Sequence, residues 1–80
     1  MKVDFLKIDG QFVSNLTSER LDEAAVRCFV DVAHIVGVKT VAEFVDNPVT
    51  LAALKAMGVD YAQGFFLHKP APLAQLGVAA

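Results

Sequence analysis

Eighty residues are enough for one small domain or for part of a larger one. The composition is 55% hydrophobic with a mean hydropathy of +0.48, which is rich for a small soluble domain and indicates strands covered on both faces or apolar surface meant for another part of the protein. The net charge is −2 and the pI is near 5.5, so the chain lacks the excess of basic residues that binding to a nucleic-acid backbone requires. A nucleic acid polymer is therefore excluded as a partner.

The first elements predicted along the chain are a strand and a long helix. Partial alternation of apolar residues favours a strand over about Phe5 to Ile8, and Gly10 ends it. Residues 11–18 read as a connector, and apolar residues at helical spacing then predict a helix over Glu19 to Val36 with Gly37 as its C-cap. The expected core stripe of this helix comprises Leu21, Ala25, Cys28, Phe29, Val32 and Val36.

The second predicted strand, over Val38 to Phe44, carries a carboxylate at its end. Regular alternation would place Val41 and Glu43 on one face, and the remaining residues on the other: Thr40, Ala42 and Phe44. A carboxylate at the carboxyl end of a buried strand is costly to desolvate without a partner, and this end of a parallel sheet forms the ligand crevice in α/β proteins. Glu43 is therefore the first candidate for a functional site.

The rest of the chain reads as one more helix, one more strand and a tail. Asn47 is a good N-cap for a helix over residues 48–57, because its side chain can accept a hydrogen bond from the first turn. A third strand is predicted over Val59 to Phe66. The tail from His68 to Pro72 is expected to be a loop, and Leu73 to Leu76 to begin a last helix.

The predicted order is strand, helix, strand, helix, strand, with connections long enough for parallel crossovers. Three parallel strands alone leave two open edges and at least one uncovered face. The fold class expected is therefore α/β, as a parallel βαβαβ segment of a larger sheet or barrel. A free-standing small α/β protein is the alternative, and its open edges argue against it.

Polar side chains stand near the ends of all three predicted strands: Lys7, Glu43 and Gln63. Because the carboxyl ends of parallel strands meet at one edge, we expect these side chains to converge at the mouth of a barrel. Lysine can hold a phosphate oxygen or an attacking water, and glutamate can bind a divalent cation or take a proton from water. Gly64, beside the glutamine, lets the backbone turn or approach a ligand closely. The alternative is a structural ion pair between Lys7 and Glu43 at the rim.

Three stretches of the sequence together resemble a known family. They are Asp4 to Gly10 (DFLKIDG), Val41 to Asp46 (VAEFVD), and Asp60 to Phe66 (DYAQGFF) followed by Lys69-Pro70. In this order and spacing they resemble the closing part of EAL-domain cyclic-di-GMP phosphodiesterases. The resemblance implies that residues 1–80 form the last third of a (β/α)₈ TIM-type barrel. It also implies an activity in bacterial signalling, the hydrolysis of cyclic di-GMP to linear pGpG with Mg²⁺ or Mn²⁺.

The resemblance implies roles for individual residues. Lys7 corresponds to the family lysine near the attacking water and the scissile phosphate. Glu43 corresponds to a catalytic glutamate that serves the second metal ion or activates water. Gln63 corresponds to the glutamine at the substrate end of the last barrel strand. Asp9, the acidic residue of the lysine motif, and Asp46 are expected to contribute to substrate binding.

Two residues depart from the family pattern, because Asp46 stands where a second glutamate is usual and Phe44 where a glycine is common. The Glu-Ala-Leu signature and the other metal ligands of the family precede the lysine motif and are not in these residues. This chain alone is therefore expected to be inactive, with the remainder of the barrel or another copy of itself as its partner. The alternative is a non-catalytic EAL domain that acts as a cyclic-di-GMP receptor or a protein-interaction module.

The compartment follows from the cysteine count and from the absence of long apolar runs. The lone Cys28 cannot form a disulfide within the chain, so a reducing cytoplasm is the natural setting. No apolar run approaches the ~20 residues of a membrane span, and no signal peptide is visible. We expect a cytoplasmic segment without membrane contact, although a longer parent protein could carry an anchor elsewhere.

Overall fold

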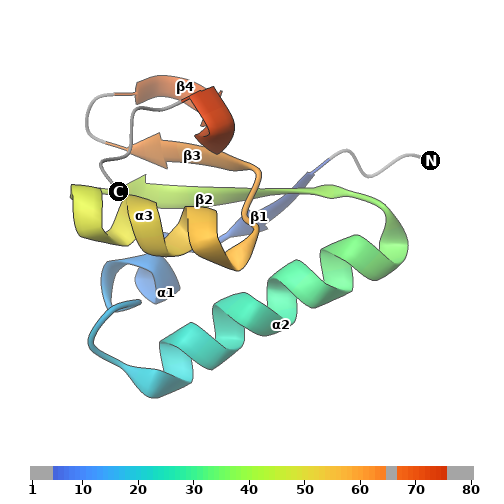
Figure 1. Ribbon diagram of the computed structural model, residues 1–80, viewed down its shortest axis with the longest axis horizontal. Helices are drawn as coiled ribbons and strands as arrows, with labels where there is room; N and C mark the ends of the chain where they lie inside the picture. Colours follow the sequence, from blue (N-terminus) through green and yellow to red (C-terminus); the bar gives the residue numbers. More distant parts are fainter. Residues whose placement is uncertain (1–4, 65–66, 76–80) are drawn as a thin grey trace.

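The computed structural model describes residues 5–64 and 67–75 (Figure 1). Their elements, in chain order, are β1 (Phe5–Ile8), α1 (Gly10–Ser14), α2 (Arg20–Val36), β2 (Lys39–Val45), α3 (Pro48–Met57), β3 (Tyr61–Gly64), β4 (Leu67–Pro72) and the short 3₁₀ helix η1 (Leu73–Gln75). The sheet order is β1-β2-β3-β4; the first three strands are parallel and β4 pairs antiparallel with β3. The predicted α/β class and its parallel βαβαβ order are therefore confirmed.

Local capping fixes the carboxyl end of α2 and both ends of α3, and the sequence predicted Gly37 and Asn47 as caps. Gly37 ends α2 in the left-handed conformation, with φ of 78°, and its N–H donates to the carbonyl of Ala33. The side chain of Asn47 accepts a 2.8 Å hydrogen bond from the amide of Thr50 at the start of α3, and Gly58, with φ of 91°, ends that helix. These caps satisfy backbone groups that a helix end would otherwise leave without partners.

The helices cover one face of the sheet, and the core lies between them and the strands (Figure 1). Ile8, Ala42 and Ala62 are cross-strand neighbours in the register of β1, β2 and β3, and all three are fully buried. Because paired residues share a face, this row marks the covered side of the sheet. The residues that precede and follow it on each strand therefore point to the other side.

Helix α2 presents a different face to the core than its sequence predicted. Its buried residues are Val26, Val30 and Ala33, whereas Leu21 is 84% exposed and Cys28 is also exposed. Two apolar stripes at helical spacing run along this helix, and periodicity alone does not say which one faces the sheet. The prediction that Cys28 lies in the core is therefore wrong.

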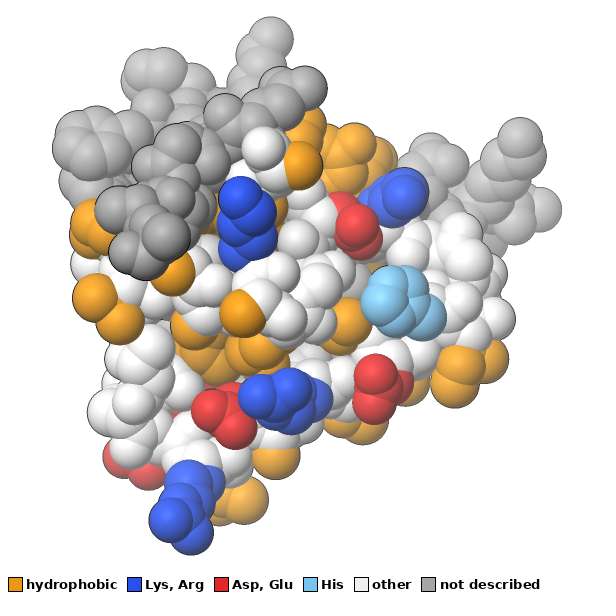
Figure 2. Space-filling view, viewed as in Figure 1, with side chains coloured by type: hydrophobic (Ala, Val, Ile, Leu, Met, Phe, Trp, Pro, Cys, Tyr) orange, Lys and Arg blue, Asp and Glu red, His pale blue; other side chains and the backbone are white. Residues whose placement is uncertain are grey.

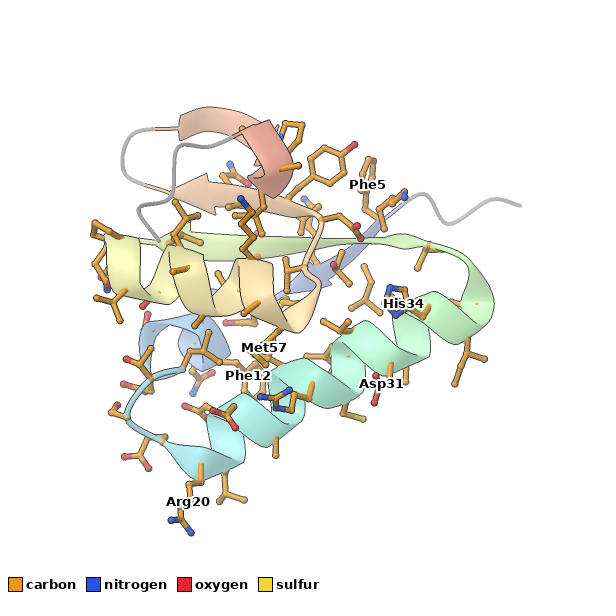
Figure 3. The ribbon with its side chains drawn as sticks, in the orientation of Figure 1. Phe5, Phe12, Arg20, Asp31, His34 and Met57 are labelled. Atoms are coloured by element: carbon orange, nitrogen blue, oxygen red, sulfur yellow. The ribbon has the colours of Figure 1, made fainter. Side chains whose placement is uncertain are left out.

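The outward surface of α2 mixes apolar side chains with charges of both signs (Figure 2). Arg27 and Glu23 form an exposed ion pair there, with 3.5 Å between Nε and Oε1. Phe29, a member of the predicted stripe, is half-buried, and its ring meets that of Phe12 edge to face, with 5.4 Å between centroids. Phe12 and Met57 are half-buried against the core, and Figure 3 shows both on the side of α2 that faces the rest of the fold.

The connector expected after β1 contains the short helix α1. The carboxylate of Asp9 accepts a 2.8 Å hydrogen bond from the amide of Gln11 and so caps this helix. The helix places Val13 in the core, where it is fully buried. Asp9, as an N-cap residue, was the feature of the sequence that indicated a helix here. One N-cap residue is not enough to predict a helix of only five residues.

The loop expected over His68 to Pro72 is wrong, because β4 occupies it. Proline lacks the N–H that a central strand needs, but β4 is an edge strand of the described sheet, where Pro70 and Pro72 are tolerated. Beyond it, η1 stands where a last helix was expected, and Leu73 is buried. Parts of two predictions, at residues 65–66 and at Leu76, lie outside the described residues.

A hydrogen-bonded pair ties the amino ends of β2 and β3 together. Thr40 is 1% exposed, and its amide and hydroxyl donate to Oδ2 of Asp60 at 3.0 and 3.2 Å. In return, the amide of Asp60 donates to the hydroxyl of Thr40 at 3.0 Å. The carbonyl of Asp60 also accepts a 2.9 Å bond from the amide of Leu73. This clamp links two strands and η1 through buried Thr40 and half-buried Asp60.

We predict that Asp60→Ala destabilises the protein, because it leaves the buried amide and hydroxyl of Thr40 without an acceptor. The free energy of unfolding should fall by about 1–3 kcal/mol, the usual cost of such orphaned groups. Urea unfolding of the complete protein measures it, with Asp31→Ala on the exposed surface of α2 as a control that should stay within about 0.5 kcal/mol of wild type. Equal stability of the two variants would show that the clamp contributes nothing.

Candidate functional site

An extra residue in β2 shapes the carboxyl end of the sheet. Val41 pairs with Tyr61 and Ala42 with Ala62, but the next pair is Val45 with Gly64. Three steps along β2 therefore match two steps along β3, which is a β-bulge. Bulges kink a strand and redirect its side chains, and they are frequent next to active sites.

The bulge holds Phe44 in a conformation that glycine normally adopts. Its φ is 59°, and among the described residues it is the non-glycine residue with a positive φ. The sequence predicted that Phe44 shares a face with Thr40 and Ala42. That prediction is wrong, because those two are buried under the helices while Phe44 is 69% exposed.

Two glycines make room for this arrangement. A Cβ added to Gly64 would overlap the carbonyl oxygen of Val45, so β3 passes too close to the bulge for any side chain. A Cβ added to Gly10 would overlap the ring of Phe44. The sequence indicated close backbone approach at Gly64, and the structure shows that the approach is to β2 itself.

A cavity of about 540 Å³ opens beside the bulge. It is lined by Ser14, Glu43, Phe44, Val45, Asp46, Gln63 and Gly64. Glu43 and Gln63 are half-buried and Asp46 is exposed. The structure thus brings three of the predicted site residues around one space. Ser14 and Phe44 were not predicted for it: α1 supplies the first, and the bulge supplies the second.

Lys7 lies on the same face of the sheet as Glu43 but nearer to the amino ends of the parallel strands. It pairs with Val41, two residues before Glu43, which is about 7 Å along a strand. It lines a second cavity of about 380 Å³, together with Phe5, Val41, Tyr61 and Pro70. The rings of Phe5 and Tyr61 meet edge to face there, with 5.4 Å between centroids (Figure 3). Lys7, Glu43 and Gln63 therefore point to one side without lining a common cavity.

The ion pair considered from the sequence is not formed. In the part of the chain that the structure describes, Arg27 and Glu23 are the pair within salt-bridge distance, and Lys7 has no carboxylate within that limit. The register separates Lys7 from Glu43, and both side chains stay available for other contacts.

The two aspartates predicted for substrate binding have local hydrogen bonds. Asp9 caps α1 and is not among the residues that line either cavity described above. Oδ1 of Asp46 accepts a 2.8 Å bond from the side-chain amide of Asn47, which orients it at the rim of the larger cavity. Asp9 therefore supports the site through the helix that carries Ser14, whereas Asp46 can meet a ligand directly.

The carboxylates of the cavity do not complete a metal site. Across residues 5–64 and 67–75, no cluster of three or more His, Cys, Asp or Glu side chains is placed to hold an ion. Glu43 and Asp46 line the same cavity and offer two carboxylates at most. Divalent cations such as Mg²⁺ take six oxygen ligands, so other ligands would have to come from outside the described residues or from substrate and water.

Within the described residues, none of the helices has the length and apolar character that crossing a bilayer requires.

Comparisons with known proteins agree on one family. A family model described as the EAL domain matches residues 1–70. The cyclic di-GMP phosphodiesterase PdeB of Shewanella oneidensis is 45% identical over 74 residues, which cover 92% of this chain and 9% of that protein. The chain thus spans about a tenth of the length of the curated relatives it matches.

Solved structures match the fold as well as the sequence. The EAL domain of Mycobacterium smegmatis DcpA superposes with a TM-score of 0.76 at 38% identity, over 91% of this chain and 33% of that chain. Klebsiella pneumoniae BlrP1, solved as a manganese and cyclic-diGMP complex, superposes with a TM-score of 0.77 at 25% identity, over 90% of this chain and 18% of that one. The fold is therefore a segment of the TIM-barrel type found in EAL domains.

We predict that Gly64→Ala disrupts the bulge, because the new methyl group would overlap backbone atoms of β2 that cannot rotate away. The cost should reach the upper end of the about 1–3 kcal/mol typical of overpacking. Gly37→Ala is the matched control, since Gly37 has a positive φ and open space around it, and should cost about 1 kcal/mol. Urea unfolding of the complete protein compares them, and a smaller cost at Gly64 than at Gly37 would contradict the packing argument.

Proposed function

Because this chain belongs to the EAL domain family, we propose that residues 1–80 form the C-terminal part, about the last third, of a cyclic-di-GMP phosphodiesterase barrel. The similarity to a cyclic di-GMP phosphodiesterase at 45% identity supports this activity, in which cyclic di-GMP is hydrolysed to linear pGpG. The observation that carries the proposal is the cavity at the carboxyl end of parallel strands, where half-buried Glu43 and Gln63 lie on adjacent strands.

The proposed chemistry assigns a role to each side chain. Water attacks a phosphorus atom of the substrate and one P–O bond opens, so the site needs a group that orients water or accepts its proton. We assign that role to Glu43, because it is a half-buried carboxylate near the end of a strand and lines the larger cavity. The amide of Gln63 can donate to a substrate oxygen from the neighbouring strand.

Lys7 contributes positive charge on the same face of the sheet. Its ammonium group is a compact point charge on a flexible stem. It can bind a phosphate oxygen from a position nearer to the amino ends of the strands than Glu43. Asp46 contacts substrate from the rim in this proposal, and Asp9 completes the substrate-binding set through α1. A cytoplasmic location belongs to the proposal too, since Cys28 is exposed and has no cysteine partner in the chain.

A divalent cation, Mg²⁺ or Mn²⁺, is part of the proposed activity, because the similar BlrP1 was solved with manganese and cyclic diGMP. Such an ion supplies positive charge at the phosphate and acidifies bound water. Glu43 is the residue that would hold it, with Asp46 as the second carboxylate of the cavity. The remaining ligands would come from the rest of the barrel.

A non-catalytic EAL domain is the second candidate. The observation that favours it is the ring of Phe44, which brings apolar bulk into the cavity beside the proposed catalytic carboxylate. Such a domain would bind cyclic di-GMP and transmit the binding to a partner without hydrolysis. The turnover of the complete protein decides between the two candidates.

We predict that Glu43→Gln in the complete protein lowers kcat by about 10² or more, because it removes a group that accepts a proton or holds a cation. The Kd for cyclic di-GMP should change little, since the amide keeps the size of the side chain. Glu23→Gln on the exposed surface of α2 is the matched control and should keep wild-type turnover. Full turnover in Glu43→Gln with excess Mg²⁺ would remove Glu43 from the mechanism.

We predict that the 80-residue chain alone has no phosphodiesterase activity and is not a stable monomer. The described sheet leaves one edge of β1 without a partner strand, and Phe5 is 47% exposed on the uncovered face. Size-exclusion chromatography with light scattering measures the oligomeric state, beside a hydrolysis assay with Mg²⁺ and with Mn²⁺. A sharp monomer peak with cooperative unfolding would contradict the first half, and metal-dependent release of pGpG would contradict the second.

A further inference from the structure

The backbone of Phe44 has a constrained conformation at the mouth of the larger cavity. A positive φ is rare for a bulky residue and persists where the surrounding structure determines it. Here the bulge fixes the backbone from one side, because Val45 and Gly64 pair immediately after it. The direction in which the ring leaves the strand is therefore set by the sheet.

One side of the ring lies against Gly10. The three atoms nearest to a Cβ built on Gly10 all belong to Phe44, so the ring sits where that methyl group would be. Gly10 begins α1 and is not among the glycines with a positive φ, so its backbone would accept alanine. Glycine is needed at this position to seat the ring of Phe44.

The rest of the ring is open. Phe44 is 69% exposed and lines the cavity together with Glu43 and Gln63. An exposed aromatic side chain held in one orientation is a stacking surface for a planar group. The polar side chains that line the cavity with the ring are two carboxylates, an amide and the hydroxyl of Ser14, which can hydrogen-bond the edge of such a group.

We propose that Phe44 is a specificity-determining residue, whose open ring surface stacks on a purine base of the bound nucleotide while Asp46 and Gln63 meet the edge of that base. Every base has a π face, and aromatic side chains that stack on bases are a common device of nucleotide recognition. A guanine edge carries N–H donors, which match the carboxylate of Asp46 at the rim. This inference rests on the proposed function, because it takes the nucleotide to be cyclic di-GMP.

The test uses the complete protein, cyclic di-GMP, and an analogue in which one guanine is replaced by fluorescent 2-aminopurine. Phe44→Leu keeps apolar bulk and removes the π face; we expect KM and Kd to rise about tenfold with kcat within about twofold. Phe44→Trp keeps a π face and should bind within about threefold of wild type. Stacking quenches 2-aminopurine, so the quenching should survive in the tryptophan variant and be lost in the leucine variant.

Gly10→Ala tests the seat of the ring separately. Its methyl group would displace Phe44, so we expect a rise in Kd close to that of Phe44→Leu, and no further rise when the two changes are combined. Phe44→Gly is the second variant should leucine not fold, because glycine accepts the positive φ without strain. It should also lose the quenching.

The outcomes separate the two proposals. Wild-type Kd and wild-type quenching in Phe44→Leu, or in Phe44→Gly if that is the variant that folds, would overturn the stacking role and leave the phosphodiesterase intact. A wild-type protein that neither binds nor hydrolyses cyclic di-GMP would overturn the proposed function, and the stacking role with it. Additive effects of Gly10→Ala and Phe44→Leu would show that the ring is not seated on Gly10.

Discussion

One extra residue in β2 is the constraint on which the carboxyl end of this sheet depends. In a regular strand Glu43 and Phe44 would point to opposite faces, one to the open side and one under the helices. The bulge turns both toward the same cavity. It exists because β3 offers Gly64 where any side chain would overlap the carbonyl of Val45. The backbone geometry of the bulge thus determines which side chains line the cavity.

The two ends of the sheet differ: the amino end carries stabilising hydrogen bonds, and the carboxyl end carries the cavity. At the amino end, Thr40 and Asp60 exchange three hydrogen bonds in a partly buried setting, and Asp60 also holds η1. At the carboxyl end, Glu43 and Gln63 remain half-buried and face open space. TIM-type barrels keep this division throughout, with active sites at the carboxyl ends of the strands. The clamp at the amino end and the register shift at the carboxyl end lie on the same two strands, so the bulge is confined to the end that carries the cavity.

The parts of the fold that could be predicted from the sequence are those with a local cause. Gly37 and Asn47 end or begin helices through contacts within a few residues, so their patterns were sufficient. The face that α2 turns to the core has no local cause, because the helix carries two apolar stripes and contact with the sheet determines which one is buried. Strand β4 was missed because prolines usually forbid a strand, and their tolerance at a sheet edge requires knowledge of the neighbouring strand.

The same distinction explains what was recovered of the site. The sequence could predict that Glu43 and Gln63 face one space, because each lies near the end of its own strand and on the same side of the sheet, and both line the larger cavity. Phe44 was placed on the wrong face because a bulge is a property of two paired strands, and no pattern within β2 reveals it. A glycine common at this position was the available hint, since glycine suits a positive φ. The side chain at position 44 can therefore vary without moving Glu43, because Gly64 and the strand register, rather than the residue at 44, hold the bulge in place.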